Sequence, residues 1–144
     1  VRVTHRTLVD ELWNDSRIFL KEGKLTFAEN EARKFKEDCH RLAGVAKSAV
    51  VYRVPGGIGE VRAFVFTQSD QPAVRILFSK DSQKFEPVAV AVTSAGVQGD
   101  DAYGSWNAQL CSGKPDAAGK GYVQIEFVGE AQLSRIEIDE SRVD

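Results

Sequence analysis

Residues 74–88 have the sequence VRILFSKDSQKFEPV, which is typical of two β-strands joined by a tight turn. Val74, Ile76 and Phe78 recur at every second position, and this period of two gives a strand one apolar face. The polar KDSQ segment that follows is a turn, after which residues 85–92 return as a second strand. The stretch therefore predicts a half-buried β-hairpin.

Similar strands lie on both sides of this hairpin. They are predicted at residues 49–54, 60–67, 123–127 and 136–138. Pro-Gly-Gly at 55–57 ends the first of them. Residues 60–67 are apolar on both faces, which is typical of a strand in the middle of a sandwich. No long amphipathic helix separates the strands, as parallel α/β folds require, so the sequence predicts an all-β, antiparallel β-sandwich of the jelly-roll type.

The first 45 residues lack this alternation. Residues 8–13 are compatible with a turn of helix, and residues 28–38 contain helix-forming side chains with too few apolar positions for a buried helix. We expect this segment to be a charged connection, irregular or with a short helical turn.

Length and charge restrict the class of protein. A chain of 144 residues has room for one domain, 1–144, and its formal net charge of −2 argues against a duplex nucleic-acid binder. No apolar run is long enough to span a membrane. The chain starts at Val1 and contains no Met. We therefore expect a piece of a longer, multidomain protein, whose secretion signal would lie outside it.

The two cysteines, Cys39 and Cys111, leave two alternatives open. A disulfide between them would close a long loop and contribute roughly 4 kcal/mol on the chain-entropy model. The other alternative is two small buried thiols. Their spacing excludes a CxxC-type zinc site, and His5 and His40 do not complete a ligand set.

The hairpin also carries a family resemblance. Ser79, Asp81 and Phe85 match the strand–turn–strand of discoidin-type modules, with Ser82 where these commonly have glycine. This serine is tolerable if it adopts the left-handed conformation or if the turn differs slightly. Residues 48–55 and 121–138 resemble further strands of these modules, the last one ending in a Leu-x-x-Ile-x-Ile pattern.

The chain thus resembles the galactose-binding-like (discoidin-like) β-sandwich modules appended to bacterial carbohydrate-active enzymes. The resemblance implies a non-catalytic module, not an enzyme, that binds a polysaccharide or oligosaccharide for an attached catalytic domain. It also implies an extracellular, cell-surface or periplasmic location. Structural calcium is common in such modules, and Asp38, Glu137 and Asp139 are the candidate ligands.

Carbohydrate sites combine an aromatic face with polar side chains that bind neighbouring hydroxyls. Tyr103 is the first candidate, because it lies in a polar loop with two carboxylates. Trp106 falls on the same face of a strand as Ala108 and Leu110, so it is either a core residue or an aromatic surface for the sugar. Trp13 either contacts the ligand or packs under a loop. An arginine can bind neighbouring hydroxyls through its guanidinium N–H groups, although an ordinary surface role is the alternative for each arginine. The candidates are Trp13, Arg41, Arg53, Arg62, Asp100, Asp101, Tyr103 and Trp106.

Two functions remain open on the sequence. One is the carbohydrate-binding module, and the other is a structural, protein-interaction or adhesion sandwich without a sugar site. The fold alone does not separate them, because one sandwich architecture hosts many functions. Catalysis is disfavoured by the absence of hydrolase, nucleotide-binding and metalloprotease motifs.

Overall fold

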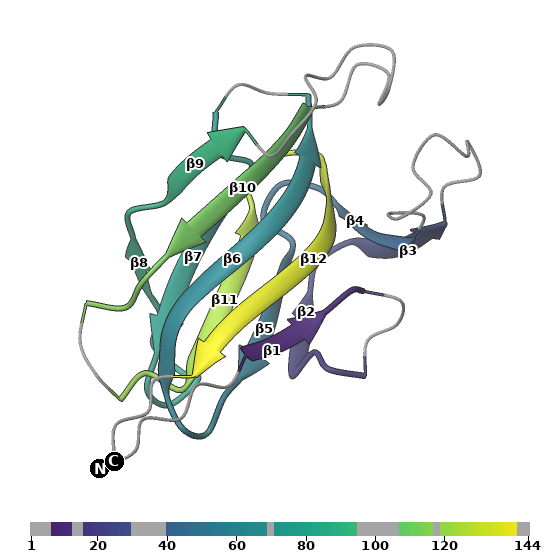
Figure 1. Ribbon diagram of the computed structural model, residues 1–144. Helices are drawn as coiled ribbons and strands as arrows, with labels where there is room; N and C mark the ends of the chain where they lie inside the picture. The colour runs from purple at the N-terminus through teal and green to yellow at the C-terminus, as the bar shows by residue number, and fades with distance from the viewer. Residues whose placement is uncertain are drawn as a thin grey trace.

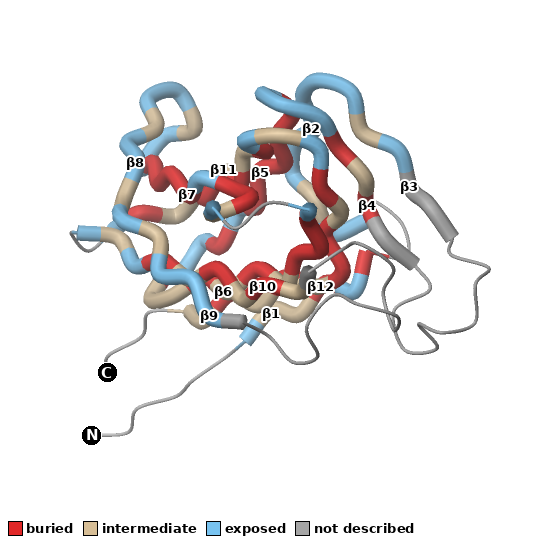
Figure 2. The backbone as a smooth tube through the Cα atoms, turned by 90° about the horizontal axis from the view of Figure 1, so that it is seen from above, coloured by how far each residue is buried: buried red, intermediate tan, exposed pale blue. Residues whose placement is uncertain are grey.

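The computed structural model describes residues 7–12, 16–29, 40–68, 71–94, 107–116 and 119–140. These residues form two β-sheets that lie face to face, and Figure 2 shows the two layers with their buried segments turned toward one another. The predicted all-β antiparallel β-sandwich is confirmed. Within the described ranges there is no helix with the length and apolar character needed to cross a lipid bilayer.

Twelve strands make up the two sheets in the described part of the chain. The seven-stranded sheet contains β1 (Thr7–Asp10), β3 (Leu25–Glu29), β4 (His40–Gly44), β6 (Ile58–Thr67), β9 (Ala91–Ser94), β10 (Asn107–Gly113) and β12 (Ala131–Glu140). The five-stranded sheet contains β2 (Leu20–Glu22), β5 (Ala49–Arg53), β7 (Val74–Ser79), β8 (Glu86–Val88) and β11 (Tyr122–Phe127).

Neighbouring strands are mostly distant in sequence. The order in the larger sheet is β3-β4-β12-β6-β10-β9, with β1 also paired to β12, and in the smaller sheet it is β2-β5-β11-β7-β8 (Figure 1). The long strands β6 and β12 lie side by side in the middle of the larger sheet. A strand with neighbours on both edges has no free edge, which agrees with the prediction that residues 60–67 are central.

The core lies between the sheets. Every second residue of β11 points inward, as predicted, and Val123, Ile125 and Phe127 are at most 1% exposed. Tyr52 and Phe78 are the largest side chains that meet them from β5 and β7. Burial of such apolar surface is the main favourable term in folding.

The N-terminal segment differs from its prediction. Residues 7–10 form strand β1 rather than a helical turn, and the following residues contribute β2, β3 and β4. Leu8 packs against the core and β1 pairs with β12, so tertiary pairing overrides the local preference of a short, charged segment. Ala28 and Glu29, expected to start a helix-forming stretch, lie in β3, and residues 30–38 lie outside the described residues.

The return from the hairpin at residues 85–92 is also different. It is two strands in different sheets, because β8 pairs with β7 whereas β9 pairs with β10. The chain crosses from one layer to the other at residues 89 and 90, and Val88 and Val90 pack against the core there. Such corners are a common way for a strand to change sheets.

Strand β12 contains an irregularity that explains the Leu-x-x-Ile-x-Ile pattern. Leu133 faces the core at an odd position, whereas Ile136 and Ile138 face it at even ones. The register against β6 shifts between Leu133 and Arg135, and the extra residue, Ser134, donates its hydroxyl to the Phe64 carbonyl at 3.3 Å. This β-bulge changes which parity faces inward.

The turn after β7 explains how serine replaces the glycine of the resemblance. Ser82 has φ of 64°, which is the left-handed conformation, the first of the two ways in which serine could stand at this position. Its N–H donates to Ser79 Oγ at 3.0 Å, and the Asp81 carboxylate accepts the N–H groups of Gln83 and Lys84. Backbone hydrogen bonds to the carboxylate lower the pKa of Asp81.

We expect Ser82→Gly to raise the free energy of unfolding by about 0.5–1 kcal/mol, because glycine adopts this conformation without a clash at Cβ. Urea denaturation followed by circular dichroism measures the change. Ser82→Ala, which keeps the β-carbon, is the matched control and should give no gain. An equal gain in both variants would show that backbone conformation is not the cause.

Candidate functional site

An aromatic pair lies on the outer face of the five-stranded sheet, the face turned away from the other sheet. Tyr122 alternates with the inward Val123 and therefore points outward. Phe19 precedes β2 and is held to β5 by its N–H, which donates to the Val51 carbonyl at 2.7 Å. The two rings meet edge to face, with centroids 5.4 Å apart and an interplanar angle of 60°.

Arg53 lies beside this pair. It is directly opposite Tyr122 in the pairing of β5 with β11, and it is exposed. Directly opposed residues of antiparallel strands have their Cβ atoms about 5 Å apart on one face. We call Phe19, Tyr122 and Arg53 the aromatic platform.

The aromatic platform has the chemistry of a sugar contact. Phe19 is 49% exposed, which is unusual for a phenylalanine, and the neighbouring Leu20 is 47% exposed. An open ring face can pack on the C–H face of a pyranose, while a guanidinium donates to hydroxyls. Arg53 is thus the one sequence-predicted sugar residue with a described side chain that stands beside exposed aromatic surface.

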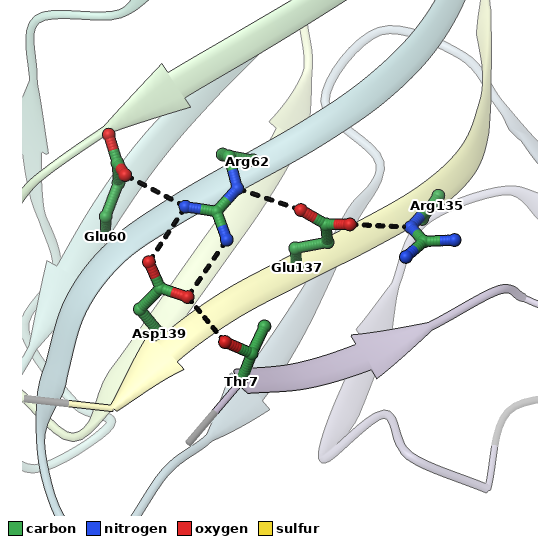
Figure 3. Close-up of polar contacts among 6 residues, drawn as sticks. All are labelled: Thr7, Glu60, Arg62, Arg135, Glu137 and Asp139. Carbon is green, nitrogen blue, oxygen red and sulfur yellow. Dashed lines mark hydrogen bonds and ion pairs between the residues drawn. The ribbon is translucent and has the colours of Figure 1, made fainter. Parts of the chain in front are cut away.

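A second polar cluster lies on the outer face of the seven-stranded sheet and is centred on Arg62 of β6 (Figure 3). Its Nε donates to Glu137 Oε1 at 2.9 Å, and Nη1 and Nη2 donate to the two carboxylate oxygens of Asp139 at 2.8 and 2.9 Å. Nη1 also reaches Glu60 Oε1 at 2.9 Å. These four contacts define the Arg62 cluster.

The pairing of β6 with β12 creates the Arg62 cluster. Glu137 is directly opposite Arg62, and Asp139 is opposite Glu60. Thr7 of β1 adds a hydrogen bond to Asp139 at 2.8 Å. The Arg62 N–H group holds the pKa of the Glu137 carboxyl below its usual value, and the Asp139 carboxylate raises the pKa of Arg62.

This arrangement bears on the expected calcium ligands. Glu137 and Asp139 both serve as acceptors for Arg62, whose positive guanidinium lies where a cation would bind. In their present positions the two carboxylates do not fit a calcium ion, which would have to displace the arginine. The described part of the chain has no group of three His, Cys, Asp or Glu side chains suited to a metal. Asp38 lies outside the described residues, and calcium stays a prediction.

Arg62 itself, expected as a hydroxyl-binding fork, instead donates four hydrogen bonds to carboxylates. The backbone of Arg41 lies in β4 opposite Ala28, and its side chain is not described. Tyr52 of β5 is 0% exposed and belongs to the core rather than to a surface site. The remaining candidates lie outside the described residues: Trp13, Asp100, Asp101, Tyr103 and Trp106.

Cys111 is a free thiol in β10 and is 0% exposed. Its Sγ donates to Gln109 Oε1 at 3.6 Å, and burial raises its pKa to about 11. Of the two alternatives for the cysteines, the structure therefore has the buried thiol at Cys111. Cys39 lies outside the described residues.

Sequence reasoning did not identify Phe19 or Tyr122 as site residues. The signal for Tyr122 was present, because inward Val123, Ile125 and Phe127 leave it on the opposite face. No comparable signal existed for Phe19, whose position depends on the pairing of the short strand β2 with β5.

No protein-family model and no curated protein matches the sequence. Solved structures share the fold. The K1 cleaved adhesin domain of Lys-gingipain from Porphyromonas gingivalis has a TM-score of 0.60 and 12% identity, covering 95% of this chain and 99% of that one. A family 6 carbohydrate-binding module has a TM-score of 0.56 and 13% identity, covering 93% and 94%.

A family 6 module from Clostridium stercorarium, solved with cellobiose, has a TM-score of 0.50 and 14% identity over 94% of both chains. At these identities the likeness shows a common β-sandwich fold. It extends over at least 93% of each chain compared.

Proposed function

We propose that this chain is a non-catalytic carbohydrate-binding module. The observation that carries the proposal is the fold, which matches family 6 carbohydrate-binding modules over at least 93% of both chains. One of those modules was solved with cellobiose. The aromatic platform adds support, because it presents exposed aromatic surface and an arginine on a sheet face.

The biological setting belongs to the same proposal. The module binds a polysaccharide or oligosaccharide outside the cell or at its surface, and it raises the local concentration of an attached polysaccharide-degrading domain on that glycan. A discoidin-like, galactose-binding-like ancestry is part of the proposal and rests on the hairpin residues Ser79, Asp81 and Phe85. Binding will be weak, since most sugar hydroxyls remain solvated.

The test is affinity electrophoresis of the chain through gels that contain soluble plant, algal and host polysaccharides. We expect one glycan to retard the chain. Phe19→Ala and Tyr122→Ala should weaken binding about five- to tenfold if the aromatic platform holds the sugar, because a ring contact contributes about 1 kcal/mol. Tyr103→Ala, Trp106→Ala and Trp13→Ala test the alternative site of the sequence prediction.

Val128→Ala is the matched control, because Val128 is 50% exposed and lies in the turn after β11, outside the aromatic platform. Circular dichroism must show that each variant is folded. Loss of retardation in the Tyr103 or Trp106 variant alone would move the site from the sheet face to the segment that contains these two residues. Unretarded migration in every gel would contradict the proposal.

The second candidate function is adhesion or protein interaction without a sugar site. It is favoured by the adhesin domain of Lys-gingipain, whose TM-score of 0.60 exceeds the 0.56 of the sugar-binding module. Under this alternative the aromatic platform would contact a protein, and none of the gels would retard the chain.

A further inference from the structure

A pocket of about 500 Å³ lies beside the corner at which the chain passes from β8 to β9. Residues 87–89 and Ala91 supply apolar lining, and Ser112 and Lys114 come from β10 and the residues that follow it. Glu60 of β6 and Asp116 add two carboxylates. The pocket volume falls within the range of about 300–1,000 Å³ that is usual for small-molecule sites.

The lining combines acceptors, donors and apolar surface. Glu60 and Asp116 accept hydrogen bonds, the Lys114 ammonium donates them, and the Ser112 hydroxyl does both. Two negative charges against one positive charge disfavour a polyanion such as a phosphorylated ligand. Hydroxyl groups, which both donate and accept, suit this mixture, and the apolar residues suit C–H groups.

Glu60 is held in place from outside the pocket. Its Oε1 accepts from Arg62 Nη1 at 2.9 Å, and the same guanidinium is fixed by the paired carboxylate of Asp139. A carboxylate anchored in this way loses less side-chain entropy when a ligand binds. The Arg62 cluster therefore acts as a positioning device for the pocket.

We infer that this pocket binds one or two units of a neutral saccharide, with Glu60 and Asp116 accepting from its hydroxyls and Lys114 donating to them. The inference rests on the proposed function and adds a second sugar-binding site to the chain, separate from the aromatic platform. A pyranose ring would place its C–H groups against residues 87–89. A volume of about 500 Å³ is large enough for a sugar unit with bridging waters.

The experiment is a titration of the ¹⁵N-labelled chain with cellobiose, laminaribiose and xylobiose, and with fragments of any polysaccharide that retards the chain. Amide chemical shifts report where each sugar binds. We expect the largest shifts at the amides of residues 88–91, 112–114 and 116, because Pro87 and Pro115 have no amide hydrogen. Asp116→Asn and Glu60→Gln should weaken this binding at least fivefold, and Ala89→Phe should abolish it by filling the pocket.

Glu130→Gln, which neutralises an exposed carboxylate outside the pocket, is the matched control and should leave the affinity unchanged. Asp116→Asn keeps the test independent of the Arg62 cluster, because Asp116 is not part of it. Shifts confined to the aromatic platform or to residues 99–106, with unaltered affinity in the pocket variants, would overturn the inference and leave the proposed function standing. No binding of any sugar in this titration and no retardation in gels would overturn both.

Discussion

Tyr52→Phe will lower the free energy of unfolding by about 2 kcal/mol, although only one oxygen atom is removed. The Tyr52 ring is 0% exposed, and its hydroxyl donates to Asp10 Oδ2 at 2.8 Å. Asp10 is itself 4% exposed and accepts the Leu12 N–H through Oδ1 at 2.9 Å. The substitution leaves one oxygen of a buried carboxylate without its donor, which costs more than a lost surface hydrogen bond.

Urea denaturation of Tyr52→Phe, Asp10→Ala and the double variant measures the coupling between the two side chains. We expect the double variant to be less destabilised than the sum of the single ones, by about 2 kcal/mol. Tyr122→Phe, at a tyrosine on the outer face, is the matched control and should change stability by less than about 0.5 kcal/mol. Additive single effects would mean that the Tyr52–Asp10 hydrogen bond contributes little.

Alkaline pH gives an independent readout of the same pair. Burial and the neighbouring Asp10 carboxylate raise the pKa of Tyr52 well above its ordinary value of 10.0. A raised pKa in the folded state means that this group's contribution is complete below pH 10 and falls as the pH rises toward the folded value. We therefore expect stability above pH 10 to fall more steeply in the native chain than in Tyr52→Phe.

Arg62→Met will lower the free energy of unfolding by about 1–2 kcal/mol at pH 7. This loss of stability is small for a side chain with four contacts to carboxylates, because Arg62 is 23% exposed and solvent screens the charges. Removal of the guanidinium also leaves Glu60, Glu137 and Asp139 to repel one another. Thermal and urea denaturation at low ionic strength measure the loss.

The pH dependence of this loss follows from Glu137. Its pKa is depressed in the folded state, so its contribution to stability is present above the ordinary glutamate value of 4.5 and disappears as the pH falls further. The difference between the native chain and Arg62→Met should therefore shrink below pH 4.5. Arg62→Lys, which keeps the charge without the fork, is the control and should retain part of the effect. A difference that stays constant from pH 7 to pH 3 would contradict the ion-pair explanation.

The sequence predicted those strands in which one face is apolar over several positions. Strands β7 and β11 appear where the alternation placed them, because burial of one face favours a single register. Strand β5 appears where its β-branched run placed it. The strands β1 to β4 were missed, since they are short or charged and form mainly through pairing with distant strands. Leu8 illustrates this, because its partner is Ile138 at the other end of the chain.

The candidate site was less predictable, because its parts meet only through long-range pairing. Arg53 and Tyr122 become neighbours when β5 pairs with β11, and no local pattern gives that register. The same holds for Arg62, which looks like a surface arginine until β6 and β12 bring it opposite Glu137. The odd or even position of a residue in a strand indicates which face its side chain occupies. Which residue lies opposite it depends on how distant strands pair in the folded chain.

The bulge at Ser134 divides β12 into two parts whose inward-facing residues have opposite parity. Before it, odd-numbered residues enter the core, and after it, even-numbered residues do. Substitutions at Ser134 can preserve this shift, whereas loss of the residue would turn Ile136 and Ile138 outward and carry Glu137 and Asp139 into the apolar interior. Outer-face positions of β12 outside the Arg62 cluster, such as Gln132, therefore tolerate a change of residue type far better than the strand tolerates a change of one residue in its length.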